Sequence, residues 1–239
     1  MSTNDQIKLD SYFNNRTVDP AYYGTYKIPR YLRPVLPVSK TAKILDIGCG
    51  FGQFLSKLKE EEYTCLHGID ISNEAIEECK KKGLEVTQIN NICDFIVPDT
   101  EKFDFIVMSH VLEHIDKDKI IDTLRHIKQN LLAKNGAFVL MVPNGQSFTG
   151  TYWRYEDFTH TIVFTSGSCI YVLKAAGFDS ISFIDADGTS QMRFWKKPII
   201  RFLIGFYKLK EDFWGMVLQT SYHKPSPRIY SFELKVIAK

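Results

Sequence analysis

The sequence contains no apolar run of the ~18 to 20 residues that a membrane-spanning helix needs. Its first ten residues, MSTNDQIKLD, lack the basic and apolar regions of a secretory signal peptide. The net charge of +2 is too small to indicate nucleic acid as a partner. We therefore expect a cytoplasmic protein with no transmembrane segment, acting on small molecules.

Paired cysteines are also missing. The five cysteines are odd in number and form no CxxC pair, which favours reduced thiols over a disulfide framework or a thiolate zinc site. There is no internal repeat. With 239 residues, 44% of them hydrophobic and 24% charged, the chain predicts one domain over residues 1–239 with a large α/β core.

The most informative segment that is present is ILDIGCGFGQFL, residues 44–55. An aliphatic run at 43–47 is followed by Gly48, Gly50 and Gly52 and then by further apolar residues. This order predicts a strand, a tight turn and a helix. Because glycines let the backbone approach a ligand closely, the turn predicts a binding site.

The charge at this turn argues against a phosphate ligand. Asp46 lies directly before the glycines, and Gln53 occupies the sixth place of the dinucleotide pattern GxGxxG. A carboxylate repels pyrophosphate and attracts a cation. S-adenosylmethionine (SAM) fits, because it carries a sulfonium and an ammonium group and no phosphate.

A second acid suits the ribose of that ligand. The apolar run TCLHGIDI, residues 64–71, ends in Asp70, near the spacing of about 20 residues beyond the glycines at which a carboxylate holds ribose hydroxyls. Alternatively, Asp70 caps a helix that starts near Ser72.

With GIDIS (68–72) and FDFIVMSHVLEHI (103–115), the chain resembles the class I SAM-dependent methyltransferases over about residues 43–185. The resemblance implies that Asp46 and the glycines contact the methionyl part of SAM and that Asp70 holds the ribose. Asn91 takes the place of an acid beside the adenine, with Asp94 as the alternative. Residues within or next to these motifs complete the predicted cofactor site: Cys49, Ile71, Ile92 and Ser109.

Alternating strand and helix patterns extend along the chain. Further strands are predicted at 84–89, 103–109, 137–142, 178–185 and 229–238, and helices at 73–82, from about 120 to 132, and from 165 to 176. They predict a Rossmann-like, seven-stranded, mostly parallel sheet with an antiparallel last strand and helices on both faces.

Two segments flank the predicted core, residues 41–190. Residues 1–40, rich in aromatics and prolines, form either a lid over the cofactor or an arm on the sheet edge. Residues 191–222 predict one or two helices, broken at Pro198, before the last strand at 229–239. This basic amphipathic insertion packs on its own domain or on a second subunit of a homodimer, which the low net charge favours, or lies on a membrane surface.

The catalytic residues are predicted where HVLEHI meets the loop after residue 143. Methyl transfer to a hydroxyl requires removal of a proton, and histidine is the natural base. If a helix starts just after Ser109, His110, Glu113 and His114 share one face. We expect His114 as the base, His160 as the second candidate and Asp157 as an orienting carboxylate. A single histidine is also commonly a structural, hydrogen-bonded residue.

The same residues permit a divalent cation site formed by His110, Glu113, His114 and His160. It resembles the ExxEH arrangement of ubiquinone-biosynthesis O-methyltransferases and small-RNA 3′-end methyltransferases, with His110 in place of the first glutamate. Histidine would shift the preference from magnesium toward manganese, iron or zinc. A metal would lower the pKa of the acceptor hydroxyl.

The loop PNGQSFTGTYWRYEDFTHTIVFT, residues 143–165, predicts the acceptor site. Its planar and hydrogen-bonding residues Asn144, Tyr152, Arg154 and Tyr155 suit a sugar. The loop resembles that of methyltransferases of bacterial surface-polysaccharide (capsule or O-antigen) synthesis, in which an RYxDxTH string precedes a helix. This implies a hydroxyl on a nucleotide-activated sugar or a glycan.

Three arginines are candidate partners for the diphosphate of a nucleotide-sugar: Arg30, Arg33 and Arg154. Other acceptors stay open, namely a sugar amine, another small molecule or a quinol, as does a catalytically silent SAM-binding partner.

Overall fold

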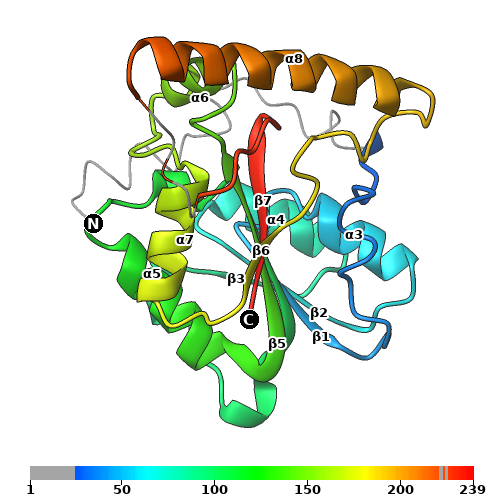
Figure 1. Cartoon of the computed structure of the whole chain (residues 1–239). Helices are drawn as coiled ribbons and strands as arrows, with labels where there is room; N and C mark the ends of the chain where they lie inside the picture. The colour runs from blue at the N-terminus through cyan, green and yellow to red at the C-terminus, as the bar shows by residue number, and fades with distance from the viewer. Residues whose placement is uncertain (1–24, 221–222, 224–225) are drawn as a thin grey trace.

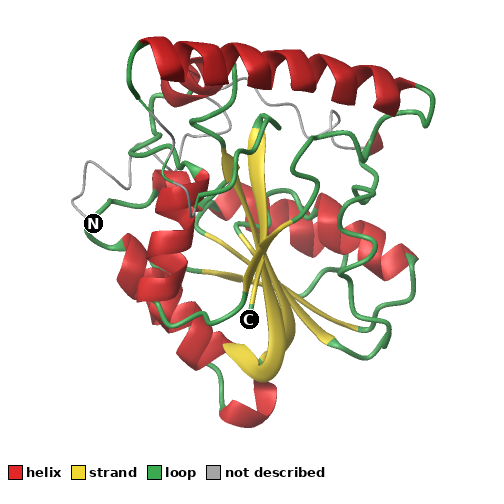
Figure 2. Ribbon diagram, in the orientation of Figure 1, coloured by secondary structure: helices red, strands yellow, loops and turns green. Residues whose placement is uncertain are grey.

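The computed structural model describes residues 25–220, 223 and 226–239. Seven strands form one sheet in the order β3-β2-β1-β4-β5-β7-β6 (Figures 1 and 2). The strands are β1 (Lys43–Ile47), β2 (Cys65–Asp70), β3 (Val86–Gln88), β4 (Phe103–Ser109), β5 (Leu132–Pro143), β6 (Ile181–Phe183) and β7 (Glu233–Ala238).

All neighbouring strands pair in parallel except β7, which runs antiparallel between β5 and β6. The predicted fold class is therefore confirmed. The strand order reverses at β1 and β4, which is the position where sheets of this kind bind ligands at the carboxyl ends of their strands.

Helices cover both faces of the sheet (Figures 1 and 2). They are α3 (Gln53–Glu60), α4 (Asn73–Lys81), α5 (Ile120–His126), α6 (Gly150–Glu156), α7 (Ser166–Ala175) and α8 (Lys196–Val217). Short 3-10 turns occur at Ile92–Asp94, Asp99–Glu101 and Leu112–His114. The predicted cap of α7 is present, because Thr165 and Ser168 form a capping box.

Side-chain alternation along the central strands builds two cores. Ile44 packs toward the face that carries α3, whereas the next residue, Leu45, packs toward the face that carries α5 and α7. Phe105 and Ile106 divide in the same way. The sheet is buried on both faces, which holds the carboxyl ends of its strands rigidly.

The predicted elements differ from the observed ones mainly at their ends. The helix predicted to reach residue 132 continues from α5 as a π-helical turn, Ile127–Leu131, and β5 already begins at Leu132. Leu132 pairs with Phe103 ahead of a register shift, and this strand pairing ends the helix at that point. Gly136, predicted to end the helix, lies inside β5, where an added Cβ would be 3.0 Å from the Phe103 carbonyl.

Pro198 does not break the helical insertion. It lies in the first turn of α8, a single helix of 22 residues. Backbone N–H groups in the first turn have no partner within the helix, so proline costs nothing there. No helix in the described part of the chain has both the length and the apolar character needed to span a bilayer.

Candidate active site

A cavity of about 770 Å³ lies at the carboxyl ends of the parallel strands. Its walls come from the glycine turn after β1, from the end of β2, from the segment after β3 and from the segment after β4. Most of the predicted cofactor residues line it: Asp46, Gly48, Cys49, Gly50, Asp70, Ile71, Asn91, Ile92 and Ser109. Gly52 is instead the N-cap of α3, directly beneath this wall.

The glycine turn has a backbone that other residues rarely adopt. Gly48, Gly50 and Gly52 all have positive φ, at 72°, 51° and 72°. A Cβ on Gly48 would overlap Cγ2 of Val111, which follows β4. The glycines therefore bring the turn close to β4 and leave its backbone exposed to the cavity.

Two buried acids stand next to this turn. Asp46 is 5% exposed, and burial, together with the charge of Asp70, raises its pKa to about 7. Asp70 accepts hydrogen bonds from the backbone N–H groups of Gly50 and Ser72, both at 2.8 Å. Burial nevertheless raises the pKa of Asp70. Two carboxyl groups in a poorly solvated cavity favour a cationic ligand, and this fits the sulfonium and ammonium groups of SAM.

Another part of the cavity lining combines apolar side chains with the amides of Asn90 and Asn91. Ile71 and Ile92 line it beside Asn91, whose Oδ1 accepts a hydrogen bond from the Cys93 N–H at 2.9 Å. Asp94, the alternative to Asn91, lies outside the cavity lining. Apolar side chains with amides beside them suit an adenine ring.

The helix predicted to begin just after Ser109 is absent, and that prediction is wrong. His110 has a left-handed backbone with φ 54°, and only Leu112–His114 form a 3-10 turn. The ring nitrogens of His110 contact Glu113 Oε1 at 3.2 Å and Glu233 Oε2 at 3.1 Å. Burial opposes its protonation, but the two carboxylates outweigh it and raise the pKa of His110 to about 10.

His114 is held by a chain of hydrogen bonds. Its Nδ1 lies 2.8 Å from Thr159 Oγ1, and Thr159 Oγ1 donates to Asp157 Oδ1 at 2.6 Å. Since the hydroxyl proton goes to Asp157, the hydroxyl oxygen accepts from a proton on His114 Nδ1, and Nε2 carries the lone pair. Burial lowers the pKa of His114, which keeps the ring neutral.

His160 lies beside His114, with ring centroids 4.8 Å apart. Its Nδ1 donates to the Trp153 carbonyl at 2.8 Å, and Arg154 donates to the carbonyl of His160 itself. Its Nε2 lies 3.9 Å from both Glu113 Oε1 and Asp157 Oδ2. The structure thus brings His114, His160 and Asp157 together at one wall.

Three of the four predicted metal ligands converge. Ligand atoms of Glu113, His114 and His160 lie within 4.8 Å of one another. Among the described residues, buried Glu113 Oε2 has no hydrogen-bond partner. An orphaned carboxylate oxygen beside two imidazoles fits a divalent cation. His110 is outside this group, because Glu113 and Glu233 hold its ring.

None of the four predicted substrate residues lines the cavity. Asn144 is buried, and its amide donates to the carbonyls of Ile229 and Ser231 at 2.8 Å, which anchors the start of the loop. Tyr152 and Tyr155 point outward from α6 and are exposed. The loop reaches the cavity through its last residues instead: Phe158, Thr159, His160 and Thr161.

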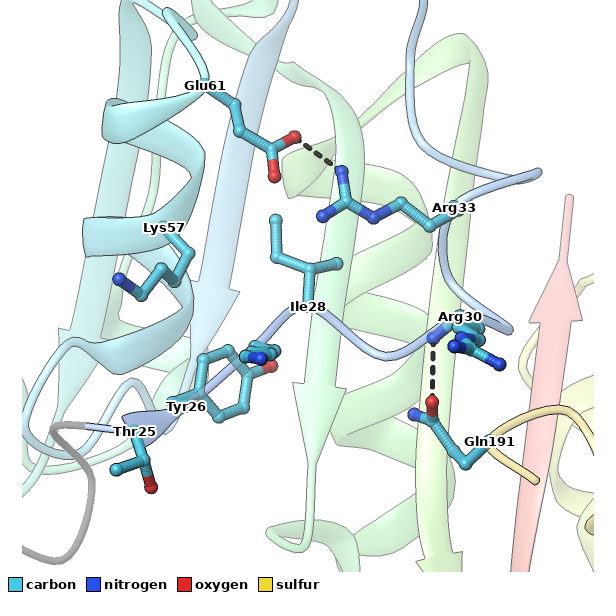
Figure 3. Close-up of a pocket in the computed structure, with 9 residues that line it drawn as sticks. Thr25, Tyr26, Ile28, Arg30, Arg33, Lys57, Glu61 and Gln191 are labelled. Carbon is cyan, nitrogen blue, oxygen red and sulfur yellow. Dashed lines mark hydrogen bonds and ion pairs between the residues drawn. The ribbon is translucent and has the colours of Figure 1, made fainter. Parts of the chain in front are cut away.

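Arg30 and Arg33 lie outside the main cavity as well. They border a separate hollow of about 700 Å³, shown in Figure 3, on the outer side of the segment that begins at residue 25. The Arg30 N–H donates to Gln191 Oε1 at 3.3 Å, and Arg33 pairs with Glu61 at 2.6 Å. Tyr26 lines both hollows. Residues 1–24 of the predicted lid lie outside the described residues.

Sequence reasoning missed Glu233, a buried acid at the start of β7 that lines the cavity. It accepts from Tyr31 at 3.4 Å and lies 3.5 Å from Lys235 Nζ, which pairs with Asp185 at 2.9 Å. The sequence contains a feature that indicates this acid: in FELKVIA, Glu233 and Lys235 are two charged residues on one face of an otherwise apolar strand.

Comparison with known proteins places the chain in a family. Residues 21–182 match the family model described as "Methyltransferase domain", so the chain belongs to that family. A SAM-dependent methyltransferase from Archaeoglobus fulgidus has the same fold, with a TM-score of 0.61 and 24% identity over 87% of this chain and 90% of that one. The chain is thus a class I SAM-dependent methyltransferase domain with SAM as its cofactor.

Curated relatives match over shorter stretches. The mitochondrial ubiquinone biosynthesis O-methyltransferase of Candida albicans is 35% identical over 83 residues, which is 30% of this chain and 24% of the relative. The EEF1A lysine methyltransferase 2 of Danio rerio is 33% identical over 100 residues, 39% of this chain and 42% of the relative. The chain therefore spans less than half of the length of either relative.

Proposed function

We propose that the protein transfers the methyl group of SAM to a hydroxyl of a sugar, carried on a nucleotide or within a glycan, in the synthesis of a surface polysaccharide. The observation that carries the proposal is the chain Asp157–Thr159–His114, which ends at the cavity wall formed by the segments after β4 and β5. A hydroxyl acceptor must lose a proton during methyl transfer, and this chain supplies an oriented base.

Bound SAM supplies an electrophilic methyl group on its sulfonium. The protein has to align the acceptor oxygen with that carbon and take up the hydroxyl proton. His114 Nε2 is the proton acceptor, because Nδ1 already carries a hydrogen directed at Thr159. The developing positive charge on the imidazole is stabilised through Thr159 by the buried carboxylate of Asp157.

The RYxDxTH resemblance supports the sugar acceptor, because its side chains build this wall. Arg154 holds the carbonyl of His160, and Asp157 fixes Thr159 through both its N–H and its hydroxyl. Thr159 in turn holds His114. Arg154, Asp157 and Thr159 of the string act as a support for the base, whereas Tyr155, the tyrosine of the string, is exposed.

Incubation of the purified protein with SAM and a panel of nucleotide-sugars tests the proposal. We expect S-adenosylhomocysteine to accumulate and one sugar to gain the mass of one methyl group. His114→Ala should lose turnover and keep SAM affinity, whereas the exposed His223→Ala should keep both. Unchanged turnover in His114→Ala would indicate an amine acceptor, and methylation of a quinol alone would overturn the sugar proposal.

A cation at Glu113, His114 and His160 is a second candidate arrangement, favoured by the unpartnered Glu113 Oε2. A bound divalent cation would supply Lewis-acid activation of the acceptor hydroxyl. The carboxylate and the two imidazoles would hold it, and His114 would then be a ligand instead of the base. Part of the ubiquinone biosynthesis O-methyltransferase matches this chain, and this match supports a quinol as the acceptor in the metal-dependent arrangement.

Calorimetric titration with manganese, alongside turnover after chelation, separates the two arrangements. Glu113→Gln should lose manganese binding, whereas Glu60→Gln, on the surface of α3, should keep it. Absence of manganese binding together with full turnover after chelation would exclude the metal and leave His114 as the base.

A further inference from the structure

Helix α8 presents an apolar strip to solvent. The strip consists of Phe202, Phe206, Leu209, Phe213 and Met216, which recur at intervals of three and four residues and so share one face. These side chains are 54% to 72% exposed, and α8 contains no buried residue. In Figure 1 the helix runs along one edge of the molecule, outside the layers that enclose the sheet.

The other side of α8 is fastened to the domain. The ring of Tyr207 packs edge-on against Tyr230, with centroids 5.7 Å apart, and Tyr230 donates to Glu211 at 3.1 Å. Asp212 pairs with Arg228 at 2.6 Å. These contacts fix the rotation of the helix, so the strip points away from the domain.

The charges of α8 are divided in the same way. Its two acids, Glu211 and Asp212, are used in the contacts with Tyr230 and Arg228. Lys208 and Lys210 lie on the two sides of the strip, Lys196 and Lys197 lie in the first turn before it, and Arg201 pairs with Asp187 at 2.8 Å. The solvent side of the helix is therefore apolar and bordered by positive charge.

We propose that α8 is an interfacial helix that binds the surface of a bilayer containing anionic lipids. An apolar strip rich in phenylalanine, bordered by lysines, is the pattern by which helices lie in the plane of a membrane surface. Trp195 and Trp214, half-exposed at the two ends of the helix, are of the type that settles at the level of the headgroups. The lysines complement the negative lipid charge.

A second copy of the chain fits the strip less well. The strip runs from Phe202 to Met216, about 21 Å along a helix about 10 Å wide, which gives about 210 Å² in projection. Stable protein interfaces bury about 800 Å² on each partner. A bilayer needs no complementary protein surface and accepts a single projecting helix.

Docking through α8 would turn the active-site end of the sheet toward the membrane. The parallel strands point their carboxyl ends at this side, and α6, which follows β5, lies beneath α8 in Figure 1. The inference holds whichever acceptor is methylated, because it depends on the outer face of α8 alone.

Sedimentation with phosphatidylcholine vesicles, with and without phosphatidylglycerol, tests the inference on the full chain. We expect binding to the anionic vesicles, with a blue shift of tryptophan fluorescence as Trp195 and Trp214 enter the interface. Phe202→Ser combined with Phe206→Ser should weaken binding about tenfold or more. Lys208→Glu combined with Lys210→Glu should abolish the preference for phosphatidylglycerol.

Val38→Ser and Tyr171→Ser, which remove exposed side chains outside α8, are the matched controls and should bind as the unmodified protein does. Failure of the unmodified protein to bind anionic vesicles would overturn the inference. So would equal binding by the Phe202/Phe206 variant. A dimer in light scattering that this variant dissociates, without vesicle binding, would assign the strip to a second copy.

Discussion

His114 Nδ1 lies 2.8 Å from Thr159 Oγ1, and this contact determines which ring nitrogen of His114 carries the proton. The Thr159 hydroxyl donates a hydrogen bond to Asp157, so its oxygen accepts a hydrogen bond from His114. The hydrogen bonds from Asp157 through Thr159 to His114 thus fix the tautomer and the orientation of a buried, neutral imidazole that can act as a base.

Thr159→Val should therefore lower kcat about 10- to 100-fold and leave the Kd of SAM unchanged, because outer partners of catalytic groups have effects of about this size. Thr159→Ser keeps the hydroxyl and should restore most of the turnover. The measurement is steady-state turnover alongside calorimetric titration with SAM. Full turnover in Thr159→Val, or an equal loss in both variants, would contradict a role that belongs to the Thr159 hydroxyl.

The pH dependence of turnover should report the same histidine. Burial lowers the pKa of His114 below its ordinary value of 6.5. A base acts in its unprotonated form, so kcat/KM for the acceptor, measured at saturating SAM to remove the effect of Asp46, should rise with pH, reach half of its maximum below pH 6.5 and then stay level. A profile that is still rising above neutral pH would point to a different proton acceptor. Thr159→Val provides the comparison, because loss of the hydrogen bond to His114 should change the pKa of this histidine and move the midpoint of the pH profile with it.

SAM affinity should depend on the ionisation of Asp46. Its pKa of about 7 in the empty site means that much of it is neutral below neutral pH, and a cationic ligand binds better to the carboxylate. The association constant should rise about tenfold per pH unit below pH 7 and level off above it. Titration in two buffers with different ionisation heats should show proton release. Asp46→Asn should bind weakly and without this pH dependence, whereas a pH-dependent Asp46→Asn would assign the proton elsewhere.

Local sequence was sufficient for the sheet and for the cofactor wall. The strand, turn and helix around Gly48 are specified by neighbouring residues. Asp46 lies one residue before the end of β1 and Asp70 ends β2, and the sheet places these two strands side by side. Parallel strands meet at one edge, so residues at their ends converge without further information.

Long-range contacts explain what the sequence did not reveal. His110 has a left-handed backbone, and its ring contacts Glu233 from the far end of the chain. Its absence from the group of candidate metal ligands therefore depends on tertiary structure. Tyr152 has the chemistry of a sugar ligand, but the outward face of α6 carries it into solvent. The proline in α8 is a different case, because it lies in the first turn, where its missing N–H has no partner within the helix.

Gly48→Ala should damage both stability and SAM binding. The positive φ of 72° costs an L-residue about 1 to 2 kcal/mol, and the new Cβ overlaps Val111. The companion change Val111→Ala removes the overlap and not the backbone strain, so the double variant should recover part of the loss. Urea unfolding of the two single variants and the double variant measures the coupling. Additive losses would show that Val111 moves aside at no cost.

Stability should fall as the pH rises from about 6.5 to about 10, because over this range the fold keeps the His110 proton that the unfolded chain has released. Its pKa is about 10 in the fold and 6.5 in the unfolded chain, so pairing with Glu113 and Glu233 stabilises the fold fully below pH 6.5 and not at all well above pH 10. The His110 side chain is 44% exposed, so solvent screens the pair, and Glu233→Gln should lower the unfolding free energy at pH 6 by only about 1 kcal/mol. That variant should also lose less stability toward pH 10 than the unmodified protein. His110→Gln removes the titrating ring and serves as the reference that cancels other groups titrating near pH 10. Urea unfolding at several pH values makes the comparison, and an identical slope in the unmodified protein and His110→Gln would show that His110 is not protonated in the fold.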